Sequence, residues 1–404
     1  MKILQVNCVY RKGSTGKIVA DIHAELQNQG INSIVCYGRG NFISEPNVYK
    51  TCPEWYSKFN HLLTRFTGIM YGGLFFSTKK LISIIEKESP DVVHLHCING
   101  YFVNIYRIVS YLNKHKIKTV LTLHAEFMYT ANCGIAFECE KWKTGCGNCK
   151  DYKRYTESKF IDGTHRSWTL MKKAFEGFES LIITSVSPWL ENRAKQSPIL
   201  GHAQHTIVFN GLDTSIFKIY NGAETRKKYG ISIDRPFVFH ATASFTTDIH
   251  SLKGGRFICE LANRCPNILF VVAGPYGQGL DIPENVKLLG RVADQHELAK
   301  LYSAADVTLI TSKRETFSMV TAESLCCGTP VVGFKAGGPE SIAIPEFSYF
   351  VDYEDVDAMQ KAIYDLMNRH FDREQLSKQA HNCYSREVMT HNFIQVYNQI
   401  IDIK

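Results

Sequence analysis

Short apolar segments alternate with amphipathic segments along almost the whole chain, and this alternation constrains the fold more than any other feature. In the first half, runs rich in Val, Ile and Leu lie at residues 1–9, 34–37, 91–96, 119–124 and 180–185. Continuous apolar runs of this length fit strands buried on both faces, and helices between such strands make the sheet parallel. The first half therefore predicts one doubly wound α/β domain.

The same pattern starts again after a break near residue 210. Asn210-Gly211-Leu212-Asp213 is a turn signal and residues 222–234 are polar and charged, so we place the linker there. Further strands are expected at 237–241, 268–273, 286–289, 307–311 and 330–334. The chain thus predicts two Rossmann-like doubly wound α/β domains that face a central cleft. Their expected limits are 1–210 and 211–380, with 381–404 as a C-terminal helix able to cross back to the first domain.

The composition narrows the class of partner and the compartment. The net charge of +7 suits an anionic partner, such as nucleic acid, a phosphorylated substrate or an acidic membrane face, without choosing among them. The opening MKILQVNCVY lacks the basic region and long apolar stretch of a secretory signal, and no run reaches the roughly 18 apolar residues of a spanning helix. We expect a cytoplasmic protein, or one peripheral on the inner face of the cell membrane.

Two glutamates eight residues apart, Glu315 and Glu323, are followed by Gly328-Thr-Pro-Val331 and Gly337-Gly-Pro-Glu340. This order resembles the donor-site signature of retaining glycosyltransferases with the GT-B fold, of the family 4 type of bacterial capsule, O-antigen and exopolysaccharide synthesis. Secondary matches follow in family order and extend the resemblance over nearly the whole chain: Gly13–Gly16, Val93–His96, Leu123-His124, Asn210–Thr214, Lys253-Gly254, Ala273-Gly274 and Leu289–Arg291.

The residues around Glu323 predict how a donor would be held. Ser318 is a plausible N-cap of a helix over Met319–Cys327, which Gly328 and Pro330 would end. The helix start would offer backbone N–H groups and a positive dipole end to a diphosphate. A carboxylate at Glu323 can accept hydrogen bonds from the two ribose hydroxyls. Solvated surface glutamates are the alternative.

The resemblance implies three catalytic residues. Lys253 would lie near the diphosphate, Glu315 against the transferred sugar, and His124, which ends a strand, at the donor sugar or its phosphate; a solvated Lys253 and a core histidine are the alternatives. The family's usual arginine before the lysine is missing, and Phe317-Ser318 stands where relatives often have Phe-Gly. The donor-binding residues expected besides Glu323 are Gly13, Gly16, Ser244, Arg256, Gly274, Arg291, Phe317, Ser318 and Met319.

Four of the thirteen cysteines, Cys133, Cys139, Cys146 and Cys149, lie within 17 residues and end in C-x-x-C. Four thiolates can hold a structural zinc ion tetrahedrally and would leave no open position for catalysis. Free or redox-labile thiols and a disulfide are the alternatives. No cofactor is expected to be required for catalysis.

Residues 55–81 combine aromatic and aliphatic side chains at spacings of three and four with the interleaved basic residues Lys58, Arg65, Lys79 and Lys80. This pattern predicts a helix that lies on an anionic membrane surface. A helix packed into the core of the first domain is the alternative.

These observations predict a retaining glycosyltransferase that moves a hexose or N-acetylhexosamine from a nucleotide diphosphate sugar, with UDP favoured, to a lipid-linked oligosaccharide. The product would be a bacterial surface polysaccharide. Alternatives are another GT-B enzyme using GDP- or ADP-sugars, or a sugar-nucleotide epimerase. A basic, zinc-containing nucleic-acid-binding protein would leave Glu315, Glu323 and Gly337–Glu340 unexplained, so we expect no nucleic-acid partner.

Overall fold

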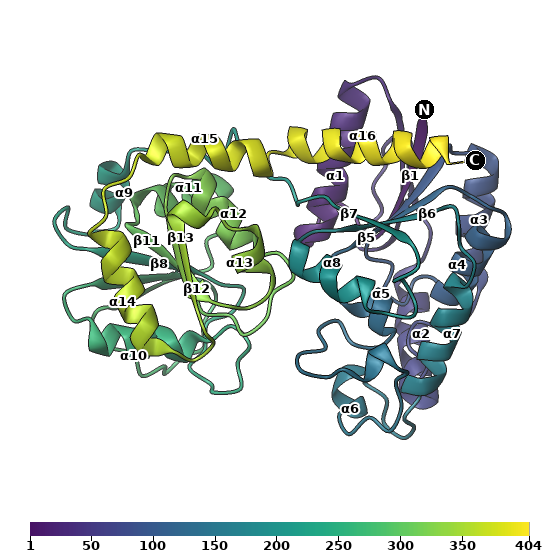
Figure 1. Ribbon diagram of the computed structural model, residues 1–404, viewed down its shortest axis with the longest axis horizontal. Coiled ribbons are helices and arrows are strands. Elements are labelled where there is room, and N and C mark those ends of the chain that lie inside the picture. The colour runs from purple at the N-terminus through teal and green to yellow at the C-terminus, as the bar shows by residue number, and fades with distance from the viewer. Residues whose placement is uncertain (404) are drawn as a thin grey trace. The chain divides into compact units, whose positions relative to one another are not determined.

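A seven-stranded parallel sheet forms the centre of the first of two units in the computed structural model, which describes residues 1–403 (Figure 1). This unit comprises residues 1–209 and the chain from Met389 onward, and the second unit is Asn210–Val388. The strand order is β3-β2-β1-β4-β5-β6-β7. The strands are β1 (Lys2–Val9), β2 (Asn32–Arg39), β3 (Val48–Lys50), β4 (Val92–Leu95), β5 (Thr119–Leu123), β6 (Leu181–Ser185) and β7 (Gln204–Ile207).

Helices cover both faces of this sheet, as the long apolar strands require. They are α1 (Gly13–Asn28), α2 (Glu54–Thr67), α3 (Phe76–Glu88), α4 (Ile105–Lys114), α5 (Phe127–Thr130), α6 (Tyr152–Tyr155), α7 (Thr164–Phe175), α8 (Pro188–Lys195) and α16 (Arg386–Asp402). On one face, Ile3, Val92, Val120 and Ile182, one from each of four neighbouring strands, pack against α1 and α16. The last helix of the chain is therefore part of the first unit's core.

The second unit repeats the architecture with a six-stranded parallel sheet in the order β10-β9-β8-β11-β12-β13. Its strands are β8 (Phe237–Ala241), β9 (Leu269–Ala273), β10 (Val286–Gly290), β11 (Val307–Ile310), β12 (Val331–Phe334) and β13 (Ser348–Val351). Its helices are α9 (Gly222–Lys228), α10 (Gly255–Arg264), α11 (Gln295–Ala304), α12 (Met319–Cys326), α13 (Gly338–Ile342), α14 (Val356–Met367) and α15 (Arg373–Tyr384). Leu261 of α10 and Ile363 of α14 are buried in the core on one face.

The ten predicted strands are present, with ends within two residues of the expected positions. The strands β3, β7 and β13, which lie at sheet edges, were not predicted. Edge strands lack the continuous apolar run that marks a strand buried on both faces, so their sequences carry a weaker signal.

Three local predictions are wrong. Gly13–Gly16 is the first turn of α1 and not a loop before it. Residues 55–81 form two helices, because Gly68 ends α2 in a left-handed conformation at φ 69°. The expected linker at 222–234 contains α9, because Asn221 accepts hydrogen bonds from two backbone N–H groups of its first turn and Arg226 pairs with Asp306 at 2.9 Å. No helix among residues 1–403 has the length and apolarity needed to cross a bilayer.

Candidate functional site

Lys253 and Glu315 come together at the carboxyl ends of β8 and β11 in the second unit. Lys253 Nζ lies 2.8 Å from Glu315 Oε1, and Ser312 Oγ donates a hydrogen bond to the same oxygen at 2.7 Å. The Glu315 backbone pairs with Ala336 and Gly338 across the neighbouring loop, at 2.9 and 2.8 Å. In open α/β sheets ligands bind at this edge, so both charged groups lie where a ligand is expected.

Two glycines allow the loops around this ion pair to approach each other. Gly254 adopts φ 66°, and a Cβ there would overlap the carbonyl oxygen of Thr311. Thr311 Oγ1 in turn donates to the Lys253 carbonyl at 2.8 Å. A Cβ at Gly338 would overlap the backbone of Thr316. Larger residues at either position would displace the loop that carries Lys253 or Glu315.

The predicted helix start after Glu315 is confirmed. Ser318 is the N-cap of α12, and its Oγ accepts a hydrogen bond from the Thr321 N–H at 3.3 Å. Ser318 also has φ 81°, a conformation that favours glycine. A glycine at this position, as in the Phe-Gly of the family signature, would meet this demand without strain. Here the serine hydroxyl compensates by capping the helix.

Glu323 lies on α12 and is oriented by a residue that no sequence pattern identified. The Tyr302 hydroxyl donates to Glu323 Oε2 at 2.9 Å, and the Tyr302 side chain is fully buried at the end of α11. Burial, and then the neighbouring Glu323 carboxylate, raise the pKa of Tyr302 well above its usual value. The two residues are separated by 21 positions, and no local pattern connects them.

His240 on β8 is a second residue that no sequence pattern identified. Its Nδ1 lies 2.9 Å from the Leu309 carbonyl oxygen, so this nitrogen carries the proton. Burial lowers the pKa of His240 to about 4, and the charges of Lys253 and Glu315 also act on it. A neutral imidazole thus lies in the electrostatic environment of the ion pair.

Four predicted donor-binding residues of the second unit lie on α10 and on the loops after β8, β9 and β10. Arg256 pairs with Glu354 at 2.5 Å and lies over the Phe257 ring at 4.3 Å. Arg291 and Ser244 are exposed on the loops after β10 and β8. Gly274 follows β9, where a Cβ would overlap the Thr242 carbonyl. Arg256 is therefore engaged by a carboxylate of its own unit.

In the first unit, His124 and Gly16 lie at the carboxyl edge of the sheet. His124 Nε2 is 3.3 Å from His96 Nδ1, and burial lowers the pKa of His124 to about 4. Gly16 packs against the end of β1, where a Cβ would lie 3.1 Å from the Val9 side chain. Gly13 begins α1 at φ 68°. These residues share the sheet edge that corresponds to the one carrying Lys253 and Glu315 in the second unit.

The four clustered cysteines lie in the loop between β5 and α7, near one another. Burial raises the pKa of Cys133 above its usual value, and it is the main cause that raises the pKa of Cys146 to about 11. The other thiols of the cluster act in the same direction on both residues. Among residues 1–403, however, no group of three His, Cys, Asp or Glu side chains is placed to hold a metal ion. The predicted zinc site is therefore wrong for the chain as the structure describes it.

A buried ion pair holds this loop instead. Glu126 is fully buried and accepts a hydrogen bond from Arg193 Nε at 2.5 Å. Its other contacts are with the Tyr129 hydroxyl and the Ala136 N–H. The Arg193 guanidinium also lies 5.2 Å from the centre of the buried Trp142 ring. Contacts of the Glu126 and Arg193 side chains thus help to fix the loop to α5 and α8.

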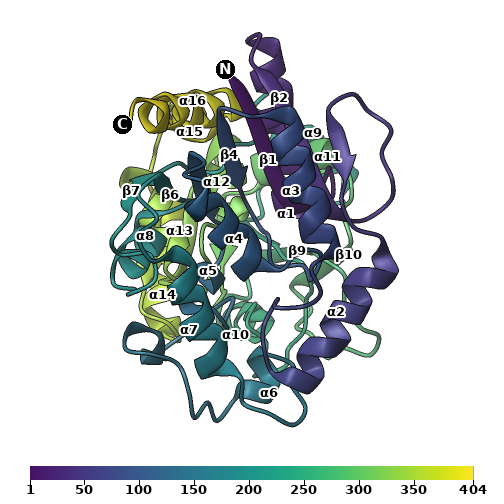
Figure 2. The same ribbon diagram turned by 90° about the vertical axis from the view of Figure 1, so that its right-hand side faces the viewer.

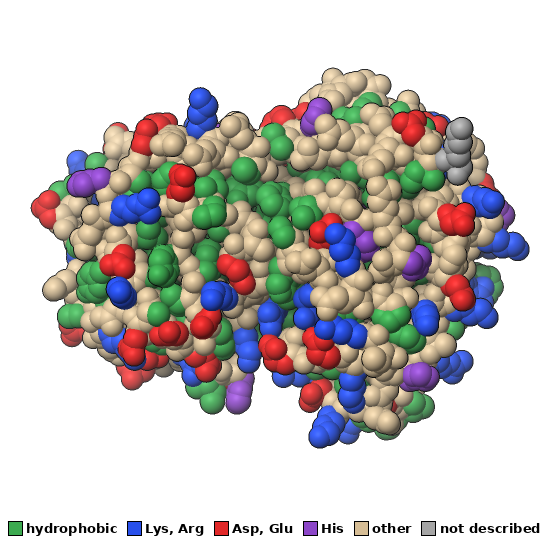
Figure 3. All heavy atoms as spheres, viewed as in Figure 1, with side chains coloured by type: hydrophobic (Ala, Val, Ile, Leu, Met, Phe, Trp, Pro, Cys, Tyr) green, Lys and Arg blue, Asp and Glu red, His purple; other side chains and the backbone are tan. Residues whose placement is uncertain are grey.

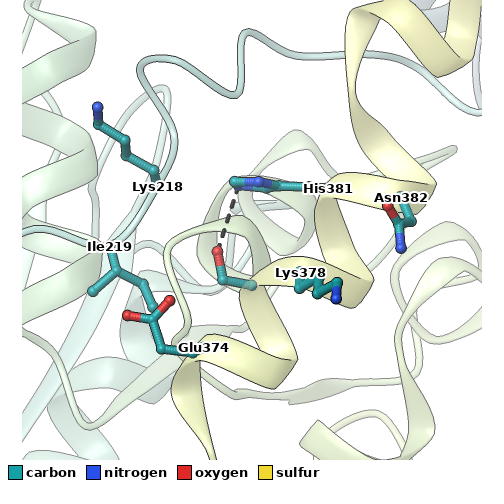
Figure 4. A pocket seen from close by; sticks show the side chains of 7 residues that line it. Lys218, Ile219, Glu374, Lys378, His381 and Asn382 are labelled. Carbon is teal, nitrogen blue, oxygen red and sulfur yellow. Dashed lines mark hydrogen bonds between the residues drawn. The ribbon is translucent and has the colours of Figure 1, made fainter.

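A shallow pocket of about 440 Å³ lies elsewhere in the second unit (Figure 4). Its lining residues are Lys218, Ile219, Glu374, Ser377, Lys378, His381 and Asn382. The His381 ring is held by the Phe217 carbonyl at 2.9 Å. None of the predicted site residues lines this pocket.

Comparison with known proteins agrees with this arrangement. Residues 259–382, which include Glu315 and Glu323, match the family Glycosyl transferases group 1. The chain is 24% identical over 420 residues to the putative colanic acid biosynthesis glycosyl transferase WcaC of Escherichia coli K12, covering 99% of this chain and 100% of that protein.

Solved structures share the fold over the full length. Sucrose-phosphate synthase from Thermosynechococcus elongatus superposes with a TM-score of 0.67 at 15% identity, covering 100% of both chains. Anabaena HepE in complex with UDP superposes with a TM-score of 0.63 at 15% identity, covering 99% of this chain and 100% of that one. The two parallel sheets are those of the GT-B fold, and the chain is a glycosyltransferase whose residues 259–382 match the group 1 family.

Proposed function

We propose that the enzyme transfers a hexose or N-acetylhexosamine, with retention of configuration, from a nucleotide diphosphate sugar to a lipid-linked oligosaccharide of a bacterial surface polysaccharide. UDP is the favoured nucleotide. The observation that carries the proposal is the Lys253–Glu315 pair beside the start of α12, with Glu323 on that helix. The Lys253 ammonium and the N-terminus of α12 suit a negatively charged diphosphate. The carboxylates of Glu315 and Glu323 suit sugar hydroxyls, which donate hydrogen bonds.

Each group has a role in this reaction. The Lys253 ammonium and the N–H groups at the start of α12 stabilise the charge that develops on the departing diphosphate. Glu315 accepts hydrogen bonds from hydroxyls of the transferred sugar, and Glu323 accepts those of the ribose. The departing phosphate oxygen takes the proton of the attacking acceptor hydroxyl on the same face of the sugar. No protein nucleophile or metal ion is needed in this route.

The relatives support the choice of substrates. HepE was solved with UDP and, in another structure, with UDP-glucose, and WcaC is named for colanic acid biosynthesis. The HepE ligands are a nucleotide and a nucleotide sugar, and the WcaC name gives a biosynthetic product. At the identities found, they are the reason for favouring UDP and a surface glycan in this proposal.

Helix α2 supports a membrane-bound acceptor. Its apolar residues Trp55, Phe59, Leu62 and Phe66 recur on one side and are 43–68% exposed, whereas the polar residues Ser57, Asn60 and Thr64 are buried against the unit. A helix of a globular protein ordinarily faces the core with its apolar side. The reversed orientation fits an anionic lipid surface, into which the apolar side would insert.

The surroundings of α2 extend this surface. Phe160, after α6, stacks on Phe66 with 5.8 Å between ring centres, and the backbone N–H of Lys159 donates to the Arg65 carbonyl at 2.9 Å. Figure 2 shows α2 at the edge of the first unit with α6 at its lower end. In Figure 3 Lys and Arg side chains gather over the part of this unit that carries α6. Basic and aromatic side chains together favour an anionic bilayer over a neutral apolar partner.

A thermal-shift series with UDP, GDP and ADP tests the donor. A nucleotide at about 100 times its Kd stabilises by roughly 2.7 kcal/mol, so only the cognate one should raise Tm strongly. The raised Tm should disappear in Lys253→Ala and persist in Lys335→Ala, whose ammonium pairs with exposed Asp352. Incubation with the matching sugar nucleotide and a lipid-linked acceptor should then give a product with retained configuration. Epimerised donor without transfer would contradict the proposal.

A further inference from the structure

His240, near the end of β8 in the second unit, has one ring nitrogen engaged and one without a partner. Its Nδ1 lies 2.9 Å from the Leu309 carbonyl oxygen. Its Nε2 is buried, and no hydrogen-bonding group among residues 1–403 pairs with it. The residue as a whole is 4% exposed. A buried polar atom that lacks a partner costs free energy, so its presence in this position calls for an explanation.

The bond to Leu309 decides what the unpaired nitrogen can do. A carbonyl oxygen only accepts, so Nδ1 of His240 carries a proton and donates it. Burial lowers the pKa of His240 to about 4, so the ring is neutral at neutral pH and holds this one proton. Nε2 therefore has a lone pair and can only accept a hydrogen bond. The partner that fits this nitrogen is a donor.

The His240 side chain lies on the face of the sheet that α10 covers. Side chains two positions apart share one face of a strand, so His240 faces the same side of β8 as Val238. Val238 belongs to the core cluster that contains Phe257 and Ile258 of α10. Lys253 precedes the first residue of α10 by two positions. The ring of His240 is thus on the same side of the sheet as the loop that carries Lys253.

The same ring lies beside the end of β11, where this loop is attached. Leu309, which holds the ring, is two residues before Thr311, and the Thr311 hydroxyl donates to the Lys253 carbonyl at 2.8 Å. The charges of Lys253 and Glu315 both act on His240, Lys253 lowering its pKa and Glu315 raising it. The unpaired nitrogen therefore belongs to the immediate surroundings of the ion pair.

The Lys253 ammonium can supply a donor. It carries three N–H groups, and the hydrogen bond recorded for it is to Glu315 Oε1 at 2.8 Å. That oxygen also accepts from the Ser312 hydroxyl at 2.7 Å, so Glu315 keeps a hydrogen bond when Lys253 turns away from it. A diphosphate would attract the ammonium and leave the Glu315 carboxylate available to sugar hydroxyls.

We propose that His240 is a positioning residue of the donor site, whose Nε2 accepts a hydrogen bond from the Lys253 ammonium when a nucleoside diphosphate is bound. This inference rests on the proposed function, which places the diphosphate at Lys253. Hydrogen bonds around catalytic groups often tighten when a ligand binds. A neutral acceptor orients the ammonium without cancelling its charge, whereas a second carboxylate would weaken its attraction for phosphate.

A double-mutant cycle on UDP binding, measured by calorimetry, tests whether His240 acts through Lys253. His240→Phe keeps a flat ring and removes the acceptor. It should raise the Kd for UDP roughly 10–100-fold, the loss expected for one hydrogen bond to a charged group. In the Lys253→Ala background the same substitution should change the Kd by less than about twofold. Equal losses in both backgrounds would overturn the inference, because a purely structural residue acts independently of Lys253.

Two further variants separate the acceptor from the bulk of the ring. His240→Gln can place an amide oxygen near the former Nε2 and should recover most of the UDP affinity. His240→Asn can still donate to the Leu309 carbonyl but is too short to offer that acceptor, and should bind UDP as weakly as His240→Phe. Equal affinities of the Gln and Asn variants would contradict a role for the acceptor.

The matched control is His381→Phe, in the pocket of Figure 4. It removes a comparable bond between an imidazole and a backbone carbonyl, 2.9 Å from His381 Nε2 to the Phe217 oxygen. Its Kd for UDP should stay within about twofold of the wild type. Melting temperatures show for every variant that the second unit is folded.

The nitrogen can also be followed in the unsubstituted enzyme. In ¹⁵N spectra of protein labelled at histidine, with His240 assigned through His240→Gln, UDP should move the Nε2 resonance upfield as it gains a hydrogen bond. In Lys253→Ala saturated with UDP the resonance should stay where it is. An unmoved resonance in the wild type, or an equal shift in Lys253→Ala, would overturn the inference.

Failure of this inference and failure of the proposed function give different results. If UDP, GDP and ADP all fail to bind the wild type, the proposed function fails and the positioning role fails with it. If GDP or ADP binds in place of UDP, the same cycle is measured with that nucleotide. If a nucleotide binds and transfer occurs, but His240→Phe and His381→Phe bind it equally well, only the positioning role is refuted.

Discussion

Lys253 and Glu315 form an ion pair across 62 positions of the chain, with 2.8 Å between Nζ and Oε1. The side chains are 41% and 18% exposed, so solvent screens the pair and it adds little to stability. Two loops nevertheless converge to form it, through glycines at 254 and 338. Binding of a charged ligand, which would take the place of each side chain's partner, explains this arrangement better than a contribution to folding stability.

Lys253→Ala and Glu315→Ala should each lower turnover by roughly 10²–10³-fold, because each removes one charge-stabilising group, worth about 2.7–4 kcal/mol of barrier. Steady-state kinetics with the cognate sugar nucleotide measure the effect. Lys335→Ala, which breaks the exposed pair with Asp352, is the matched control and should keep wild-type rates. Near-wild-type turnover in both site variants would refute the roles proposed for them.

Tyr302→Phe should raise KM for the donor about tenfold with a smaller change in kcat. The variant leaves the Glu323 carboxylate without its 2.9 Å hydrogen bond, and a hydrogen bond to a charged group is worth about 1.5–3 kcal/mol. The control is Tyr229→Phe, which removes a similar hydrogen bond to Glu297 at 2.9 Å. Both of these residues are distant in sequence from Glu323, the residue predicted to bind the ribose. An equal KM for both variants would show that Tyr302 does not orient a donor ligand.

Substitutions at Ser318 should separate helix capping from backbone strain. Ser318→Ala loses the cap and keeps φ 81°, and should lower the unfolding free energy by about 0.5–2 kcal/mol. Ser318→Gly also loses the cap but relieves the left-handed conformation, and should be close to the wild type. Calorimetric melting of the three proteins checks the order. An alanine variant as stable as the glycine variant would contradict this account.

Replacing Phe59 and Phe66 by Ser should weaken binding to vesicles that contain anionic lipid, because the variant removes two rings from the exposed side of α2. Phe75→Ser with Phe76→Ser should act in the same direction at the start of α3. Flotation with anionic and zwitterionic vesicles measures this. The control, Ile233→Ser with Ile249→Ser, removes exposed apolar residues of the second unit. Equal flotation of all variants would remove the support for a membrane surface.

Stability should fall as the pH falls from about 6.5 toward 4. Burial lowers the pKa of His23, His124 and His240 to about 4, so these groups are neutral when folded and gain protons on unfolding in this range. Each contributes a slope of up to about 1.4 kcal/mol per pH unit, and the contribution is full above pH 6.5. Urea unfolding at pH 7.5, 6 and 5 measures the slope. Identical unfolding midpoints at pH 7.5 and 5 would contradict the assignment of neutral histidines.

The division between sequence and structure follows the range of the interactions. Ten of the strands, the N-cap at Ser318 and the helix over Met319–Cys326 were predictable, because apolar runs and capping residues act within a few positions. The donor-site residues Glu315, Glu323 and Lys253 were identified by a family resemblance, and their roles stay predictions. Even there, the conformational demand at Ser318 appears only in its φ angle.

The tertiary structure alone decided which of these groups meet. Tyr302 reaches Glu323, His96 connects His124 to Gln5, and the side of α2 that faces solvent is its apolar side. It also decided against the zinc site, since spacing along the chain places four thiols in one loop but does not aim them at one point. Each outcome depends on contacts between segments brought together by the sheets. Local periodicity fixes which segments are strands and helices, and only packing fixes which side chains face one another.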